Sequence, residues 1–154
     1  MTSYEIVKLL HILSATVLFG TGLGTAFVVW NANRGGDVAA VAFATRHAVL
    51  ADWLFTTPAV FFQPLSGLWL VHEIGYGFTE TWLLWVYGLY ALVGACWLPV
   101  VAIQNRMRRL AARAAIEGTA LPETYHRCMR AWLLLGWPAF ISLMAIFWLM
   151  VARP

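Results

Sequence analysis

The residue in this sequence with the most specific chemistry is His11, which lies near the start of an apolar run at residues 9–30. A neutral imidazole among apolar residues most often hydrogen-bonds to a neighbouring helix, and less often binds a metal or a haem iron. The residues that share its helical face form a narrow, flat surface, namely Ala15, Leu18, Gly22, Thr25 and Val29. With the Gly-x-x-x-Gly step of Gly20 and Gly24, this helix is suited to close contact with another helix or with a flat macrocycle.

A second set of polar side chains forms one stripe along the next apolar run. Its members recur at steps of four and three residues, and they are Asp52, Thr56, Ala59, Gln63 and Ser66. We expect Thr56, Gln63 and Ser66 to make hydrogen bonds to a neighbouring helix. Asp52 either pairs with Arg46 or Arg130, or faces a cavity and carries protons together with Gln63.

A second ligand for an iron at His11 has to lie at the same depth in the membrane. Because the first helix is expected to run inward from the outer face, His47 and His126 lie too deep, near the opposite surface. His72 is the leading candidate, and alternatively it is a solvated residue at the interface. Tyr87 and Tyr90 come to similar depths.

These polar residues stand out because the rest of the chain is apolar. The 154 residues are 62% hydrophobic and 11% charged, whereas soluble domains carry about 25% charged residues. Four apolar runs each come close to the ~20 residues that cross a ~30 Å hydrocarbon core. We therefore predict an all-α membrane protein, a single four-transmembrane-helix bundle, with helices at about 4–32, 38–73, 81–115 and 122–152.

The second and fourth apolar runs share a faint pattern of an arginine, then Trp-Leu, then Pro-Ala. The residues are Arg46, Trp53 and Pro58 in the second run and Arg127, Trp132 and Pro138 in the fourth. The spacings differ by a residue or two, so the pattern indicates either two helical hairpin repeats or a chance match. Paired proline kinks at similar depth would open space within the bundle.

The charged residues are distributed unevenly among the connections between the runs. Arginines occupy the first and third connections, while the second contains Glu73 and Glu80 and no Lys or Arg. By the positive-inside rule, both termini and the second connection lie on the outer, periplasmic face of a bacterial inner membrane. The net charge of +3 is thus accounted for by the membrane, and the sequence does not point to nucleic acid.

The third helix is expected to continue past the membrane, because residues 104–116 contain no helix breaker. Arg106, Arg109 and Arg113 share one face of this extension. They contact either the headgroups of anionic lipids or an acidic partner protein.

Short motifs along the chain carry a resemblance to known families. They are Lys8-Leu9-Leu10-His11-Ile12, Phe19-Gly20, Gly22-Leu23, Arg46-His47, Ala51-Asp52-Trp53, Gln63-Pro64, Trp97-Leu98-Pro99, Gln104, Leu121-Pro122, Trp132 and Gly136-Trp137-Pro138. Over nearly its whole length the chain resembles a bacterial integral membrane family, domain of unknown function 2269. Its opening Lys-x-x-His-Ile is also similar to the first helix of the HemJ-type protoporphyrinogen oxidase family. That second resemblance covers one helix and implies a haem b ligand at His11 alone.

Three functions are compatible with these residues. The candidate cofactor-binding set is Lys8, His11, Gly22, His72, Tyr87 and Tyr90, with His11 and His72 as iron ligands. The first hypothesis is a haem b-binding inner-membrane protein that takes part in electron transfer or, as a membrane oxidoreductase, oxidises a quinol or a porphyrinogen. The second is a non-catalytic accessory or assembly subunit that docks onto a larger membrane complex. The third is a small transporter, which would need to form a homo-oligomer.

Overall fold

The computed structural model describes residues 1–152, which form four long helical segments. Three segments are single helices, namely α1 (Ser3–Gly35), α4 (Thr81–Glu117) and α5 (Glu123–Ala152). The remaining segment consists of α2 (Val38–Ala51), a π-helical turn η1 (Asp52–Thr56) and α3 (Thr57–Ile74), which follow one another without a break. All four segments are long and apolar enough to cross a membrane, and the predicted all-α four-helix architecture is confirmed.

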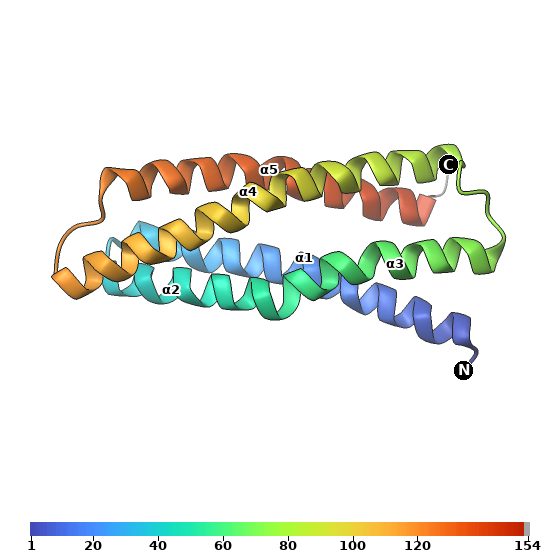
Figure 1. The fold of residues 1–154 in the computed structure, drawn as a ribbon, viewed down its shortest axis with the longest axis horizontal. Coiled ribbons are helices and arrows are strands. Elements are labelled where there is room, and N and C mark those ends of the chain that lie inside the picture. The colour runs from blue at the N-terminus through green and yellow to red at the C-terminus, as the bar shows by residue number, and fades with distance from the viewer. Residues whose placement is uncertain (153–154) are drawn as a thin grey trace.

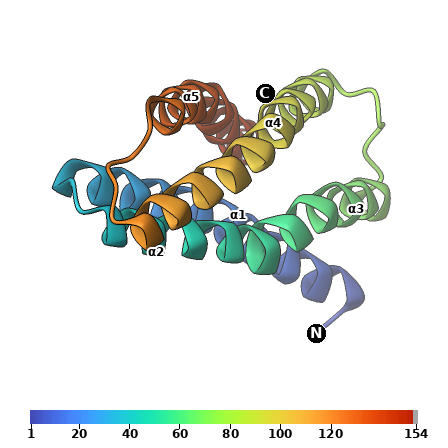
Figure 2. The same cartoon turned by 60° about the vertical axis from the view of Figure 1, so that its left-hand side comes forward.

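The segments run lengthwise beside one another (Figure 1). α1 packs against α2 and α3, and α4 packs along α5 and against α2. Figure 2 shows α5 above α1 and α2, while α4 slants from the level of α5 down to α2. The start of α1 and the end of α5 lie at one end of the bundle, which we call the terminal end. The α1–α2 turn and the α4–α5 connection (residues 118–122) lie at the other, which we call the basic end.

Local sequence signals determine where the first helices begin and end. The Thr2 hydroxyl accepts a hydrogen bond from the N–H of Glu5, and the Glu5 carboxylate accepts one from the N–H of Thr2. Gly36 follows α1 with φ 73°, a left-handed conformation that glycine adopts without steric cost. Asp37 then accepts from two N–H groups at the start of α2. The chain therefore reverses within two residues, which makes α1 and α2 antiparallel neighbours.

The π turn η1 lies directly before a proline. The N–H of Thr57 bonds to the carbonyl of Asp52, five residues earlier. In a regular α-helix, Pro58 would lack a donor and its ring would collide with the carbonyl of Leu54. The wider turn accommodates the proline without ending the helix. Pro138, the counterpart of Pro58 if the two runs are repeats, lies inside an uninterrupted α5, so the two prolines are accommodated differently.

Two clusters of apolar side chains hold the bundle together. At the basic end, Ala44, Ala48 and Ala111 allow α2 and α4 to approach closely, and Tyr125 fills the space from α5. At the terminal end the cluster consists of Val71, Trp82, Leu83, Val86, Ile146 and Leu149. Many other large apolar side chains point outward and are exposed, which is the surface expected to meet hydrocarbon rather than water.

Candidate functional site

His11 lies between α1 and α3, where its side chain meets the polar stripe. Its Nδ1 is 2.7 Å from Ser66 Oγ, and its Cε1 would be 3.3 Å from a Cβ added to Gly67. Gln63 Nε2 donates a hydrogen bond to the main-chain carbonyl of His11 over 2.9 Å. His11, Gln63, Ser66 and Gly67 therefore form one group, which we call the histidine cluster.

The Ser66 hydroxyl also lies within hydrogen-bond distance of two main-chain carbonyls of α3, those of Phe62 and Gln63. The Ser66 hydroxyl donates to the Phe62 carbonyl over 2.7 Å. A hydroxyl has one proton to donate, so with that proton on the Phe62 carbonyl the Ser66 oxygen can accept from the Nδ1–H of His11. In this tautomer Nε2 is unprotonated and has an available lone pair. Histidines that ligate metals are typically held in this way, because their second nitrogen donates to a fixed acceptor.

A buried hydroxyl without a partner lies one turn from His11. Ser14 Oγ has no hydrogen-bond partner among the described residues, whereas Thr25 on the same helix donates to the carbonyl of Thr21. On α4, Tyr87 Oη and Trp97 Nε1 are also buried and unpartnered within the described chain. Buried polar groups are normally satisfied, so these are positions where polar atoms of water or of a bound molecule would be accepted.

Asp52 is buried at the start of the π turn. Thr56 Oγ1 donates to its Oδ1 over 2.9 Å, and the Gln104 side chain on α4 is a second hydrogen-bond partner. All three side chains are buried, and we call them the aspartate cluster. Sequence reasoning did not assign Gln104 a role, although a glutamine at the end of an apolar run is itself a signal, because amides in hydrocarbon need partners.

Of the two alternatives for Asp52, the ion pair with Arg46 or Arg130 does not form within the described residues. Arg130 NH2 lies 3.0 Å from Glu123 Oε1, and no ion pair of Asp52 with Arg46 or Arg130 exists in the described part of the chain. Asp52 is buried among the helices, while Arg46 is exposed. Asp52 is instead a buried, hydrogen-bonded carboxyl group, and the other alternative, a proton carrier facing a cavity, stays a prediction.

The predicted polar stripe is confirmed as a buried face, but its members have different neighbours. Asp52, Thr56, Ala59, Gln63 and Ser66 are all buried. The first two belong to the aspartate cluster, and Gln63 and Ser66 contact α1 in the histidine cluster. Gln63 donates to main chain and has no bond to Asp52, so a proton-carrying role for the pair stays a prediction.

His72 and Lys8 lie apart from the histidine cluster. His72 is exposed in the last turn of α3, six residues after Ser66. Six residues correspond to about 9 Å along a helix and a rotation of about 240°, so His72 leaves the face that contacts α1. Lys8 is exposed, and its Nζ lies 5.5 Å from the centroid of the Tyr4 ring.

The glycines of α1 do not provide the expected helix contact. A Cβ on Gly20, Gly22 or Gly24 would meet nothing within 4 Å, so the Gly-x-x-x-Gly step is not used inside this bundle. Close approach of α1 and α3 occurs at Gly67 instead. Tyr90, another predicted site residue, hydrogen-bonds to the main chain of α3, and Tyr87 packs at the terminal end.

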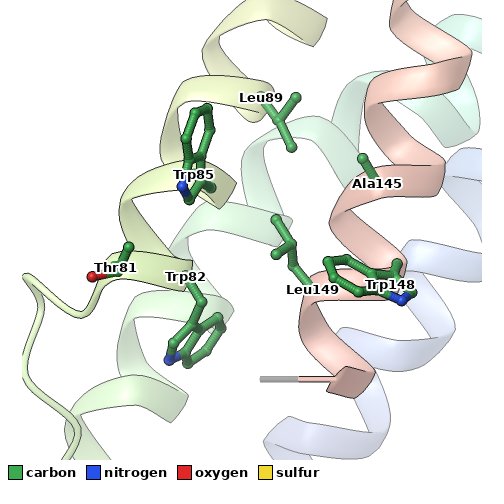
Figure 3. Close-up of a pocket in the computed structure, with 7 residues that line it drawn as sticks. All are labelled: Thr81, Trp82, Trp85, Leu89, Ala145, Trp148 and Leu149. Atoms are coloured by element: carbon green, nitrogen blue, oxygen red, sulfur yellow. The ribbon is translucent and has the colours of Figure 1, made fainter. Parts of the chain in front are cut away.

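Two of the concavities on the surface of the described residues are well defined, and His11 lines neither of them. The first has a volume of about 410 Å³ at the basic end and is lined by Arg106, Arg109, Leu110 and Arg113. The second, of about 600 Å³, is an apolar groove between α4 and α5, lined by Thr81, Trp82, Trp85, Leu89, Ala145, Trp148 and Leu149. Figure 3 shows Trp85 and Trp148 at opposite sides of this groove. Its apolar lining suits the acyl chains of surrounding lipid.

Four apolar helical segments, with their polar side chains largely confined to contacts between helices, define a polytopic integral membrane protein. The chain belongs to the family described as predicted integral membrane protein (DUF2269), whose sequence profile matches residues 5–154. No curated protein and no solved structure matches the chain. The resemblance to domain of unknown function 2269 is thereby confirmed.

Proposed function

We propose that the protein binds a haem b through His11 and passes electrons from a membrane-soluble reductant, such as a quinol or a porphyrinogen, to an acceptor. The observation that carries this proposal is the contact of His11 with Ser66, which supports an unprotonated Nε2 with an available lone pair. The similarity of Lys-x-x-His-Ile to the HemJ-type family points to the same residue.

The donor set around His11 fits a macrocycle better than a bare metal ion. No group of three or more His, Cys, Asp or Glu side chains in the described residues could hold an ion. A haem supplies four ligands of its own and needs one or two from the protein. The unpartnered Ser14 hydroxyl, one turn from His11, is a further group that a bound cofactor could satisfy.

Each member of the histidine cluster has a part in this proposal. Nε2 of His11 would hold the iron, and Ser66 keeps the imidazole in the required tautomer and orientation. Gln63 ties the main chain of α1 to α3, so the position of His11 along the bundle is held. A haem b supplies one-electron redox chemistry when it is bound. We no longer propose His72 as an iron ligand, because it is exposed on another face of α3.

Asp52 is the proposed proton acceptor. Oxidation of a quinol or a porphyrinogen releases protons together with electrons, and a buried carboxylate can take them up. Thr56 donates to the Asp52 carboxylate, and the Gln104 side chain on α4 is a second partner of Asp52. These two contacts hold the carboxylate between the second helical segment and α4. In this proposal Gln63 has a positioning role and does not carry protons.

The proposed location is a bacterial inner membrane with both termini on the outer face. Arg34 at the end of α1 and Arg127 and Arg130 at the start of α5 place positive charge at the basic end. Glu73 and Glu80 lie at the terminal end, where the connection between α3 and α4 has no cation. This asymmetry supports a cytoplasmic basic end; with that orientation, His11 would lie in the outer half of the bilayer.

Absorption spectroscopy of the purified protein tests the haem proposal. We expect a Soret band and an α band that are lost in His11→Ala and retained in His47→Ala. His47 is a matched control, because it is exposed and its Nδ1 lies 2.8 Å from the Phe43 carbonyl. Ser66→Ala should keep the bands but weaken haem affinity by roughly 10–100-fold. If wild-type protein that is expressed with added haem precursor shows no haem absorption bands, the proposal is wrong.

The outward glycine face favours a second candidate function, an accessory subunit of a larger membrane complex. Gly20 and Gly24 face away from the other helices of the chain, and a Gly-x-x-x-Gly step in hydrocarbon commonly packs against another helix. Gly20→Leu with Gly24→Leu should then abolish copurification with the partner complex. The control is Gly88→Leu on α4, where an added Cβ also meets nothing within 4 Å.

A further inference from the structure

The last turns of α4 extend beyond the hydrocarbon region at the basic end. The helix has 37 residues, which corresponds to about 55 Å, and a hydrocarbon core is ~30 Å thick. Its apolar part ends near residue 103, so residues 104–117 reach the headgroup region. At the same end, the Arg34 guanidinium lies 4.8 Å from the Trp30 ring, a pairing typical of the membrane interface.

This extension has two different faces. Gln104, Met107, Ala111 and Ala114 are buried against the other helices. Arg106, Arg109 and Arg113 are exposed on the opposite face and, with Leu110, line the concavity of about 410 Å³. The packed face holds the helix in place, so the three arginines are presented together at a defined position.

The three arginines have no acidic partner within the described residues. The two ion pairs of the described chain both use Glu123, which pairs with Arg127 and Arg130 on α5. Glu117 follows Arg113 by one turn, but the two do not form an ion pair. Like charges at these helical spacings repel one another, and a bound anion would remove the repulsion.

We propose that this concavity binds the phosphate headgroup of an anionic phospholipid in the leaflet at the basic end. Guanidinium groups match phosphate oxygens in bidentate geometry, and Leu110 provides an apolar wall for the adjoining glycerol and acyl carbons. The site lies at the headgroup level, so lipids of the same leaflet reach it by lateral diffusion. Three cations in one concavity fit the two phosphates of a cardiolipin-type lipid better than a single phosphate.

Native mass spectrometry of the purified full chain, titrated with cardiolipin or with phosphatidylcholine, tests this site. We expect cardiolipin to bind wild type, and the triple variant R106Q/R109Q/R113Q to lose about a hundredfold in affinity. R109Q alone should lose about fivefold. The matched control is R108Q, since Arg108 lies in the same turns but does not line the concavity, and its affinity should stay within about twofold of wild type.

Size-exclusion profiles and circular dichroism should be unchanged in all four proteins, because none of these arginines is buried. Equal binding of phosphatidylcholine, or an effect of R108Q as large as that of R109Q, would overturn the proposal. Displacement of cardiolipin by inorganic phosphate at similar concentration would assign the site to a soluble anion instead. Stronger binding of an acidic polypeptide such as polyglutamate would assign it to a protein partner.

Discussion

The Tyr90 hydroxyl on α4 donates a hydrogen bond to the main-chain carbonyl of Val60 on α3. Val60 precedes Pro64 by four residues, so this is the carbonyl that a regular helix would pair with the N–H of residue 64, which proline lacks. An unpaired carbonyl in hydrocarbon is costly, because no water is available to bond it. Tyr90 therefore joins α4 to α3 at the point where the hydrogen-bond ladder of α3 is broken.

Removal of this hydroxyl should destabilise the bundle. We expect Tyr90→Phe to lower the free energy of unfolding by about 0.5–2 kcal/mol, because the Val60 carbonyl loses its donor. Tyr87→Phe is the matched control on the same helix. Its hydroxyl is buried without a partner among the described residues, so the change should be neutral or stabilising. Denaturant titration in detergent, followed by circular dichroism, measures both, and equal losses would contradict this account.

Gly67 is predicted to be a position where alanine is not tolerated. An added Cβ would lie 3.3 Å from Cε1 of His11, so the imidazole would have to move by a few tenths of an ångström, away from its position against Ser66. We expect Gly67→Ala to lower the melting temperature and to weaken any haem absorption bands. Gly88→Ala, with open space around its Cβ, should be neutral or stabilising because alanine favours helix. Similar melting temperatures for the two variants would show that the contact at Gly67 is unimportant.

Two substitutions of Asp52 separate its structural and proton-carrying roles. Asp52→Ala leaves Thr56 and Gln104 without their partner and should cost about 1–3 kcal/mol of stability. Asp52→Asn keeps an oxygen for Thr56 and should cost less. Both variants should retain haem but slow its reduction by a quinol, because neither side chain takes up a proton. Stopped-flow absorption measures that rate, and wild-type rates in Asp52→Asn would exclude the proton role.

The orientation of the bundle can be tested with single cysteines. Gly77→Cys in the connection between α3 and α4 should react with a membrane-impermeant maleimide in intact cells. Thr119→Cys, between α4 and α5, should react only after permeabilisation. The native Cys96 and Cys128 are buried and should contribute little background. The reverse pattern would invert the proposed orientation and leave the four-helix fold unaffected.

The sequence alone was sufficient for the number of helices and for the buried face of the second segment. Hydrophobic length identifies each span, because a helix in hydrocarbon satisfies its own backbone. The helix expected at 4–32 is observed to continue to Gly35 and to end at its cap, Gly36. Hydropathy indicates only the part of a helix that lies in lipid, so it misses the last turn. Helical periodicity also placed Gln63 and Ser66 on one face, and both are buried.

Only the tertiary structure decided which of these faces meet. The contacts of His11 with Ser66, of Tyr90 with Val60 and of Asp52 with Gln104 join residues far apart in the chain. Periodicity gives the direction of a side chain around its own helix. The axial shift and crossing of two helices depend on how their whole surfaces pack, including the π turn before Pro58 and the close approach at Gly67. For that reason His11 could be selected as a candidate site residue from the sequence. The assembled bundle was needed to identify Ser66 as the partner of His11 and to show that His72 lies on another face.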